Sequence, residues 1–292
     1  MFRLATYQRQ DQVGPGILLP DGSLIPIAEA PQDPSGLMAV LEAWDAWWPR
    51  LVSLAEQAGP RIADARLLAP LQYPGKMLFA GANYSDHARE MAGGQAVAGR
   101  EPYLFLKPTR HCIIGPGEPI AIDPEFTEVD WEVEVAVVIG RTARRVSEAE
   151  ALQYVAGYVV VNDVTERVRT FRDDTVFRHD WLAGKGRDSF CPMGPAILPA
   201  AFVPDPGRIA LGLKVNGVEK QHSHTGNLIH NIPRLISYAS HLCTLDPGDV
   251  ISTGTPAGVG KGRGEFLHPG DTVEAWVEGV GSLVNPVVWA ES

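Results

Sequence analysis

The sequence predicts a β-rich α+β protein with a small N-terminal unit and a larger C-terminal one. Its 292 residues are enough for one large domain and a smaller one. The 30 glycines and 24 prolines indicate many turns. Several segments, such as 128–140, have the two-residue period of strands, whereas the clearest helical patterns cover 37–58 and 231–242.

Composition and charge exclude several classes of protein. The formal net charge of −10 is spread along the chain, which argues against binding to nucleic acid or to an anionic membrane surface. No apolar run approaches the roughly 20 residues of a membrane span, and the first residues lack the apolar core of a signal peptide. Three widely spaced cysteines, Cys112, Cys191 and Cys243, are typical of reduced thiols. We therefore expect a cytoplasmic protein.

Residues 1–70 are predicted to form the small N-terminal unit, and residues 71–292 the larger domain. Short strands joined by turns, with a hairpin turn at Asp21-Gly22, precede the helical stretch 37–58. Tryptophans 44, 47 and 48 on that stretch indicate a helix face packed into a core, with a ligand platform as the alternative. A Pro/Gly-containing linker follows at 69–75.

An acidic strand, Glu128–Gly140, is the strongest functional signal. Alternate positions place four carboxylates on one face of the strand, and these are Glu128, Asp130, Glu132 and Glu134. The opposite face is apolar. The second half of the strand is apolar on both faces, so it enters a core. Carboxylates that lead into a core need a cation, and a hard divalent ion is the simplest one. The alternative is a solvated acidic strand end.

Other side chains narrow the choice of metal ion and of reaction. His87 and Glu90 share the face of a predicted helix, Asp163 ends a second buried strand, and Lys185 is expected in a glycine-rich loop. Three carboxylates without clustered His or Cys fit Mg²⁺, Mn²⁺ or Ca²⁺ rather than zinc. The pair His222-x-His224 is interpreted as solvated, with a zinc site as the alternative. Residues 164–182 are predicted to form a charged loop and helix at the rim.

Seven segments in order resemble the fumarylacetoacetate hydrolase family over residues 73–288. They are NYSDHAREM, FLKP, DWEVEVAVVIG, YVAGYVVVNDVTER, GKGRDSFCPMGP, LKVNG and ISTGTPAGVG. The branch they look most like contains acylpyruvate and 2,4-dioxo sugar acid hydrolases. The resemblance implies mixed β-sheets rolled around a metal site in the C-terminal domain, and a homodimer.

The resemblance also implies a role for each matching residue. Metal ligands are expected at Glu132, Glu134 and Asp163, with Mg²⁺ or Mn²⁺ as the ion and Ca²⁺ as a further option. His87 and Glu90 match a lid pair that activates water, and Lys185 matches a lysine that faces the substrate's oxygens. Two further positions match residues that contact substrate: Arg167 and Thr255.

The function implied is a metal-dependent hydrolase, acting on ketonic substances, that cleaves a C–C bond in a β-diketo acid. A small-molecule oxo-acid is the expected partner. Many family members have a glutamine where this chain has Thr170, so substrate handling is expected to differ. The small, flexible composition of residues 91–102 predicts a mobile loop. Decarboxylation or isomerisation of a 2-oxo diacid, or a silent ligand-binding homologue, are the alternatives.

Overall fold

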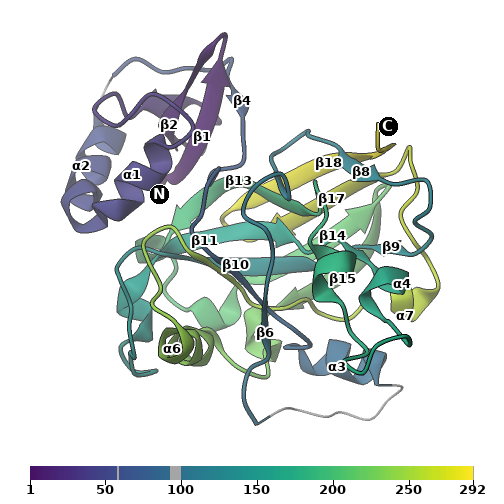
Figure 1. The fold of residues 1–292 in the computed structure, drawn as a ribbon. Coiled ribbons are helices and arrows are strands. Elements are labelled where there is room, and N and C mark those ends of the chain that lie inside the picture. The colour runs from purple at the N-terminus through teal and green to yellow at the C-terminus, as the bar shows by residue number, and fades with distance from the viewer. Residues whose placement is uncertain (58, 93–99, 292) are drawn as a thin grey trace.

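The N-terminal unit is a small sheet with two helices. A computed structural model describes residues 1–57, 59–92 and 100–291 (Figure 1). The predicted loop of residues 91–102 falls mainly on 93–99, outside this described part. The unit contains β1 (Arg3–Arg9), β2 (Gln12–Leu18), β3 (Leu24–Pro26), α1 (Gly36–Glu42), α2 (Trp44–Glu56) and β4 (Arg66–Leu67). The single helix predicted over 37–58 is wrong, because Ala43 has non-helical backbone angles and separates α1 from α2.

The main sheet continues from the N-terminal unit into the larger domain. Its strand order is β3-β2-β1-β13-β11-β10-β16-β5-β6, with β4 beside β1 and β7 beside β13. The larger domain contributes β5 (Met77–Ala80), β6 (Leu104–Leu106), β7 (Ile113–Ile114), β10 (Val133–Ile139), β11 (Val155–Asn162), β13 (Cys191–Pro199) and β16 (Val250–Ser252). The central strands β10 and β11 are rich in β-branched residues and wholly buried, as expected for strands covered on both faces.

A second, five-stranded sheet packs against the strands β10, β11 and β13. Its order is β15-β14-β17-β18-β8, and the bounds are β8 (Ile120–Ile122), β14 (Ala210–Val215), β15 (Val218–His224), β17 (Thr272–Val277) and β18 (Gly281–Trp289). A two-stranded pair joins β9 (Val129–Asp130) to β12 (Thr165–Glu166). Parallel and antiparallel pairs coexist, so the predicted mixed, β-rich α+β class is confirmed.

Short helices carry several of the predicted site residues. They are α3 (Ser85–Met91), α4 (Arg167–Thr170), α5 (Trp181–Lys185), α6 (Ile232–Leu242) and α7 (Gly260–Arg263), with 3-10 turns at Ala151–Tyr154, Ala200–Phe202, Pro206–Arg208 and Thr225–Asn227. The predicted helix at 231–242 is confirmed, and Asn231 caps it by accepting a hydrogen bond from the Arg234 backbone. Within the described residues, no helix is long and apolar enough to cross a membrane.

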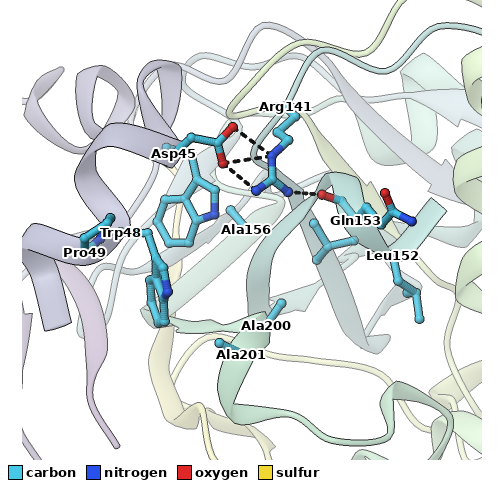
Figure 2. Close-up of a pocket in the computed structure, with 11 residues that line it drawn as sticks. Asp45, Trp48, Pro49, Arg141, Leu152, Gln153, Ala156, Ala200 and Ala201 are labelled. Atoms are coloured by element: carbon cyan, nitrogen blue, oxygen red, sulfur yellow. Dashed lines mark hydrogen bonds and ion pairs between the residues drawn. The ribbon is translucent and has the colours of Figure 1, made fainter. Parts of the chain in front are cut away.

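The N-terminal unit is attached to the larger domain by strand pairing, by packing and by ion pairs, among them Arg66–Glu118 at 2.9 Å. Figure 1 shows the unit beside β13, where Leu4 pairs with Ile197. Trp48 packs on Phe202, with ring centroids 5.8 Å apart, which confirms the predicted core role of the helix face. A junction pocket of about 370 Å³ lies beside these contacts (Figure 2), and at its rim Arg141 binds Asp45 through two oxygens at 2.9 and 3.0 Å. Autonomous folding of residues 1–70 stays a prediction.

Candidate active site

Three carboxylates converge where β10 and β11 lie side by side. Val133 pairs with Asn162, and the Asp163 backbone N–H donates to the Glu132 carbonyl at 2.8 Å. This register brings the carboxylate oxygens of Glu132, Glu134 and Asp163 to within 4.8 Å of one another, and all three residues are buried. In the described part of the chain, this is the one group of three or more acidic, His or Cys side chains so arranged.

The acidic segment is bent rather than a single strand. β9 ends at Asp130 and β10 starts at Val133, so the predicted continuous strand over 128–140 is wrong. Side chains capture the intervening backbone: Asp130 Oδ1 accepts from the Trp131 N–H at 2.7 Å, and Asn162 Oδ1 accepts from the Glu132 N–H at 2.8 Å. Because these N–H groups are used, they cannot extend a strand ladder.

Glu134 is a buried carboxylate without a cation of its own. Its Oε2 atom accepts hydrogen bonds from Ser252 Oγ at 2.5 Å and from the Gly254 N–H at 2.8 Å. Burial raises the pKa of Glu134 well above its usual value, and the neighbouring charges of Asp163 and Glu132 raise it further. A positive ion beside this carboxylate would remove the penalty for its ionisation.

Two lysines hold the other carboxylates. Lys185 Nζ donates to Glu132 Oε2 at 2.8 Å and to Asp163 Oδ2 at 2.6 Å. Lys107 Nζ donates to the other oxygen of Asp163 at 2.6 Å and to the Phe190 carbonyl at 2.6 Å. Burial by itself would lower the pKa of Lys107, but Asp163 raises it above the usual value, so the ammonium stays charged.

Arg167 and Asp130 support Glu132 from the opposite side. The guanidinium Nη2 lies 2.6 Å from Glu132 Oε1 and 2.7 Å from Asp130 Oδ2. Asp130 in turn accepts from the backbone N–H groups of Gly260 and Lys261 at 2.5 and 3.0 Å. Burial would raise the pKa of Glu132, but Lys185 and then Arg167 hold it at about 2. Arg167 therefore positions Glu132, and its predicted contact with substrate stays a prediction.

The donor set fits a hard divalent cation. Four carboxylates in this cluster are buried: Asp130, Glu132, Glu134 and Asp163. The cations that contact them are the buried Lys107 and Lys185 and also Arg167, whose side chain is 10% exposed. With all four carboxylates ionised, one negative charge is left over where the carboxylate oxygens converge. Tyr84 adds a buried hydroxyl with no hydrogen-bond partner among the described residues; burial raises its pKa, and the charge of Glu134 adds to this. Oxygen ligands and excess negative charge suit Mg²⁺ or Mn²⁺.

His87 and Glu90 form the predicted pair on α3. His87 Nδ1 lies 3.1 Å from Glu90 Oε2, and Glu90 Oε1 accepts from the Gly258 N–H at 3.0 Å. Burial would raise the pKa of Glu90, but the hydrogen bonds from His87 and Gly258 lower it, so this carboxylate is ionised. With Nδ1–H donated to Glu90, the basic lone pair of the imidazole is on Nε2. The 258–260 loop links this pair to the acidic segment, because the Gly258 N–H donates to Glu90 Oε1 and the Gly260 N–H donates to Asp130 Oδ1.

Lys185 and Thr255, the other two predicted site residues, lie on a helix and beside β10, respectively. The expected glycine loop around Lys185 is wrong: Lys185 is the last residue of α5, which Asp180 caps by accepting from the Ala183 N–H at 2.9 Å. The Thr255 hydroxyl is buried, donates to the Val133 carbonyl at 2.9 Å and accepts from Gln221 at 2.8 Å. Thr255 thus supports β10, and its contact with substrate stays a prediction.

Three of the acidic or histidine candidates lie outside the site. Glu128 pairs with Lys261 at 2.7 Å near the surface. His222 is exposed and lies 3.3 Å from Glu219, while His224 accepts from the Gly226 N–H. Neither histidine joins a metal-like group in the described part of the chain.

Sequence reasoning missed two residues of the site. Lys107 is buried against Asp163, although a lysine between a strand and Pro108 gives no sign of burial. Ser252, which binds Glu134, sits on a strand that only the tertiary fold places next to β10. The FLKP segment leaves both outcomes open for Lys107, since a lysine directly after apolar strand residues either returns to solvent or finds a buried acid.

Comparison with known proteins shows the class of protein. The family model for the fumarylacetoacetate hydrolase C-terminal domain matches residues 76–288. The chain belongs to this family. It is 37% identical to a 2,4-didehydro-3-deoxy-L-rhamnonate hydrolase of a Sphingomonas strain, over 96% of this chain and 94% of the relative.

Two further relatives show the range of reactions among similar proteins. An oxaloacetate tautomerase of Xenopus laevis is 36% identical over 98% of this chain and 90% of its own. The crystal structure of a maleylpyruvate hydrolase from Sphingobium, in complex with manganese(II) and pyruvate, is 29% identical with a TM-score of 0.80, over 99% of this chain and 100% of that one. Similar proteins are thus hydrolases and related enzymes, and one of them binds a divalent metal.

Proposed function

We propose that this protein is a divalent-metal-dependent hydrolase that cleaves a C–C bond in a β-diketo acid of the acylpyruvate or dioxo sugar acid type. One arrangement carries the proposal: a buried cluster of three carboxylates, to which the His87–Glu90 pair is linked through the 258–260 loop and Asp130. Metal binding alone would not need a buried histidine oriented by an ionised carboxylate. The hydrolases among the relatives support the same reaction class.

The residues of the chain account for the proton movements of such a cleavage. Mg²⁺ or Mn²⁺ held by Glu132, Glu134 and Asp163 would supply Lewis-acid polarisation of the substrate's oxygens. His87 Nε2 takes a proton from water as the water oxygen bonds to the distal carbonyl carbon, and Glu90 stabilises the imidazolium.

Lys185 Nζ donates to Glu132, Asp163 and Thr165 Oγ1, so all three of its N–H groups are used. In the reaction it exchanges the bond to Thr165 for one to the oxyanion that forms at the attacked carbonyl. The bond then breaks between the attacked carbonyl carbon and the carbon that lies between the two carbonyl groups. The latter carbon takes up a proton. The products are a carboxylic acid and a 2-oxo acid, so all atoms of substrate and water are accounted for.

A second candidate is isomerisation or decarboxylation of a 2-oxo diacid. The oxaloacetate tautomerase relative, which aligns with 98% of this chain, favours it specifically. The His87–Glu90 pair could equally move a proton between carbon and oxygen of an oxo-acid without adding water. A silent ligand-binding homologue is disfavoured by that pair. A cytoplasmic homodimer acting on a free oxo-acid completes the proposal.

The test is product analysis with and without metal. Acetylpyruvate and oxaloacetate are incubated with the chelator-treated protein and with added Mg²⁺ or Mn²⁺, and loss of enol absorbance, organic acids and CO₂ are followed. Metal-dependent release of acetate and pyruvate without CO₂ is expected. CO₂ release or enol–keto exchange of oxaloacetate, without cleavage of acetylpyruvate, would overturn hydrolysis in favour of the second candidate.

Variants separate the base from the metal site. His87→Ala should abolish turnover and leave metal binding intact, whereas Glu132→Ala should lose both. The matched control is His222→Ala, because His222 is an exposed histidine away from the carboxylates. Full activity in His87→Ala would rule out the assignment of the base.

A further inference from the structure

A pocket of about 360 Å³ lies beside the turn that leads into α3 and the start of α5. Its lining includes Ala82, Tyr103, Trp181 and Ile229. Tyr103 is 53% exposed, although its ring packs on Trp181 with centroids 5.8 Å apart. The pocket therefore presents aromatic surface that the described residues leave partly exposed.

The pocket adjoins the catalytic groups on two sides. Ala82 lies on the turn that leads into α3, which carries His87. Trp181 begins α5, which ends in Lys185. Between them the Phe105 ring stacks on Trp181 at 5.1 Å and contacts the Lys185 ammonium at 5.4 Å, so one ring separates the pocket from the ion pair of Lys185.

The charged segment after Thr170 builds one wall of the pocket. The Asp180 N–H donates to the Thr170 carbonyl at 2.9 Å, and the Arg172 N–H donates to the Arg178 carbonyl at 2.8 Å, so the segment closes on itself. This closure places His179 on Trp181, with ring centroids 5.6 Å apart and an interplanar angle of 13°. The result is a flat shelf of stacked rings that faces the pocket.

The charge of the pocket opposes an acidic ligand. Its described lining residues include two histidines, His179 and His230, but no lysine or arginine, and the one carboxylate is that of Glu101. Nearby Lys185 is held by Glu132 and Asp163, and Arg172 by Asp174 at 2.6 Å. A substrate with a second carboxylate in this pocket would lose hydration without gaining a permanently charged partner.

We propose that this pocket receives the acyl group of the substrate and selects an uncharged, apolar or aromatic one, with Trp181 and His179 as specificity residues. The inference rests on the proposed hydrolase function and names the substrate class within it. A flat or apolar acyl group would cover the exposed ring surface, whereas a carboxylate-terminated acyl group would meet Glu101.

The test compares kcat/KM for four acylpyruvates that differ in the acyl group: acetyl, pentanoyl, benzoyl and succinyl. Pentanoylpyruvate should exceed its near-isosteric, charged counterpart succinylpyruvate by about tenfold or more, because burying an unpaired carboxylate is costly. Trp181→Ala should lower kcat/KM for benzoylpyruvate by about tenfold more than for acetylpyruvate, since only the larger group uses the ring.

A surface variant tests the charge argument without disturbing α5. Glu101→Lys should shift the succinyl-to-pentanoyl ratio of kcat/KM by about tenfold toward succinyl. Glu56→Lys, an exposed charge reversal on α2, is the matched control and should leave the ratio unchanged. A wild-type preference for succinylpyruvate, or an unchanged ratio in Glu101→Lys, would overturn the inference while leaving hydrolysis in place. No turnover of any acylpyruvate would overturn the proposed function itself.

Discussion

Lys107→Met should destabilise the protein strongly, although Lys107 touches neither solvent nor the proposed base. Its side chain is fully buried, and its ammonium donates at 2.6 Å to Asp163 and at 2.6 Å to the Phe190 carbonyl. Breaking one partner of a buried pair costs about 3–5 kcal/mol, because the remaining charge stays buried. Lys185 still contacts Asp163, so the lower end, about 3 kcal/mol, is expected.

Urea denaturation of the chelator-treated protein measures this cost. Lys214→Met is the matched control, since Lys214 is 37% exposed and lies 3.6 Å from Glu274. That substitution should cost less than about 1 kcal/mol, as is typical of exposed pairs. Equal effects of the two substitutions would refute the argument that Lys107 neutralises a buried carboxylate.

Two further substitutions test the charge and the packing of the site. Burial and the charges of Asp163 and Glu132 raise the pKa of Glu134 in the folded protein. Ionisation of Glu134 therefore lowers the free energy of unfolding as the pH rises from the ordinary pKa of a glutamate to this raised pKa. In chelator, Glu134→Gln should therefore be more stable than wild type by about 1–3 kcal/mol near pH 8, with the gap closing toward pH 5, by urea denaturation. A gap that widened on acidification would contradict this sign. Gly184→Ala would place a Cβ 1.9 Å from Thr170 Oγ1, so it should lower the free energy of unfolding by about 1–3 kcal/mol and shift Lys185. The control is Gly59→Ala, whose Cβ would meet nothing within 4 Å and which should leave the free energy of unfolding unchanged.

The sequence predicted what depends on local pattern. The runs of β-branched residues in β10 and β11, the helix at 231–242 and the hairpin turn at Asp21-Gly22 are all specified within a few neighbouring residues. The three carboxylates could be named because two lie on β10 or beside it, and the third directly follows the strand that pairs with it.

The rest depends on contacts that local pattern does not encode. The break between β9 and β10 arises because Asp130 and Asn162, 32 positions apart, capture adjacent backbone N–H groups. The position of Lys185 at the end of α5 depends on the close approach of Gly184 to Thr170, because a Cβ at position 184 would lie 1.9 Å from Thr170 Oγ1. Lys107 is charged and buried at once, and periodicity cannot distinguish such a lysine from a solvated one.

Binding of Mn²⁺ to the chelator-treated protein tests the central claim most directly. Electron paramagnetic resonance should show a single tightly bound ion per chain, with affinity reduced about a hundredfold or more in Glu134→Gln, because a ligand charge is lost. Glu128→Gln is the matched control: Glu128 lies on the same acidic segment but pairs with Lys261 at the surface, and this variant should bind as wild type does. Wild-type affinity in Glu134→Gln, or loss of affinity in Glu128→Gln, would contradict a metal site built from Glu132, Glu134 and Asp163.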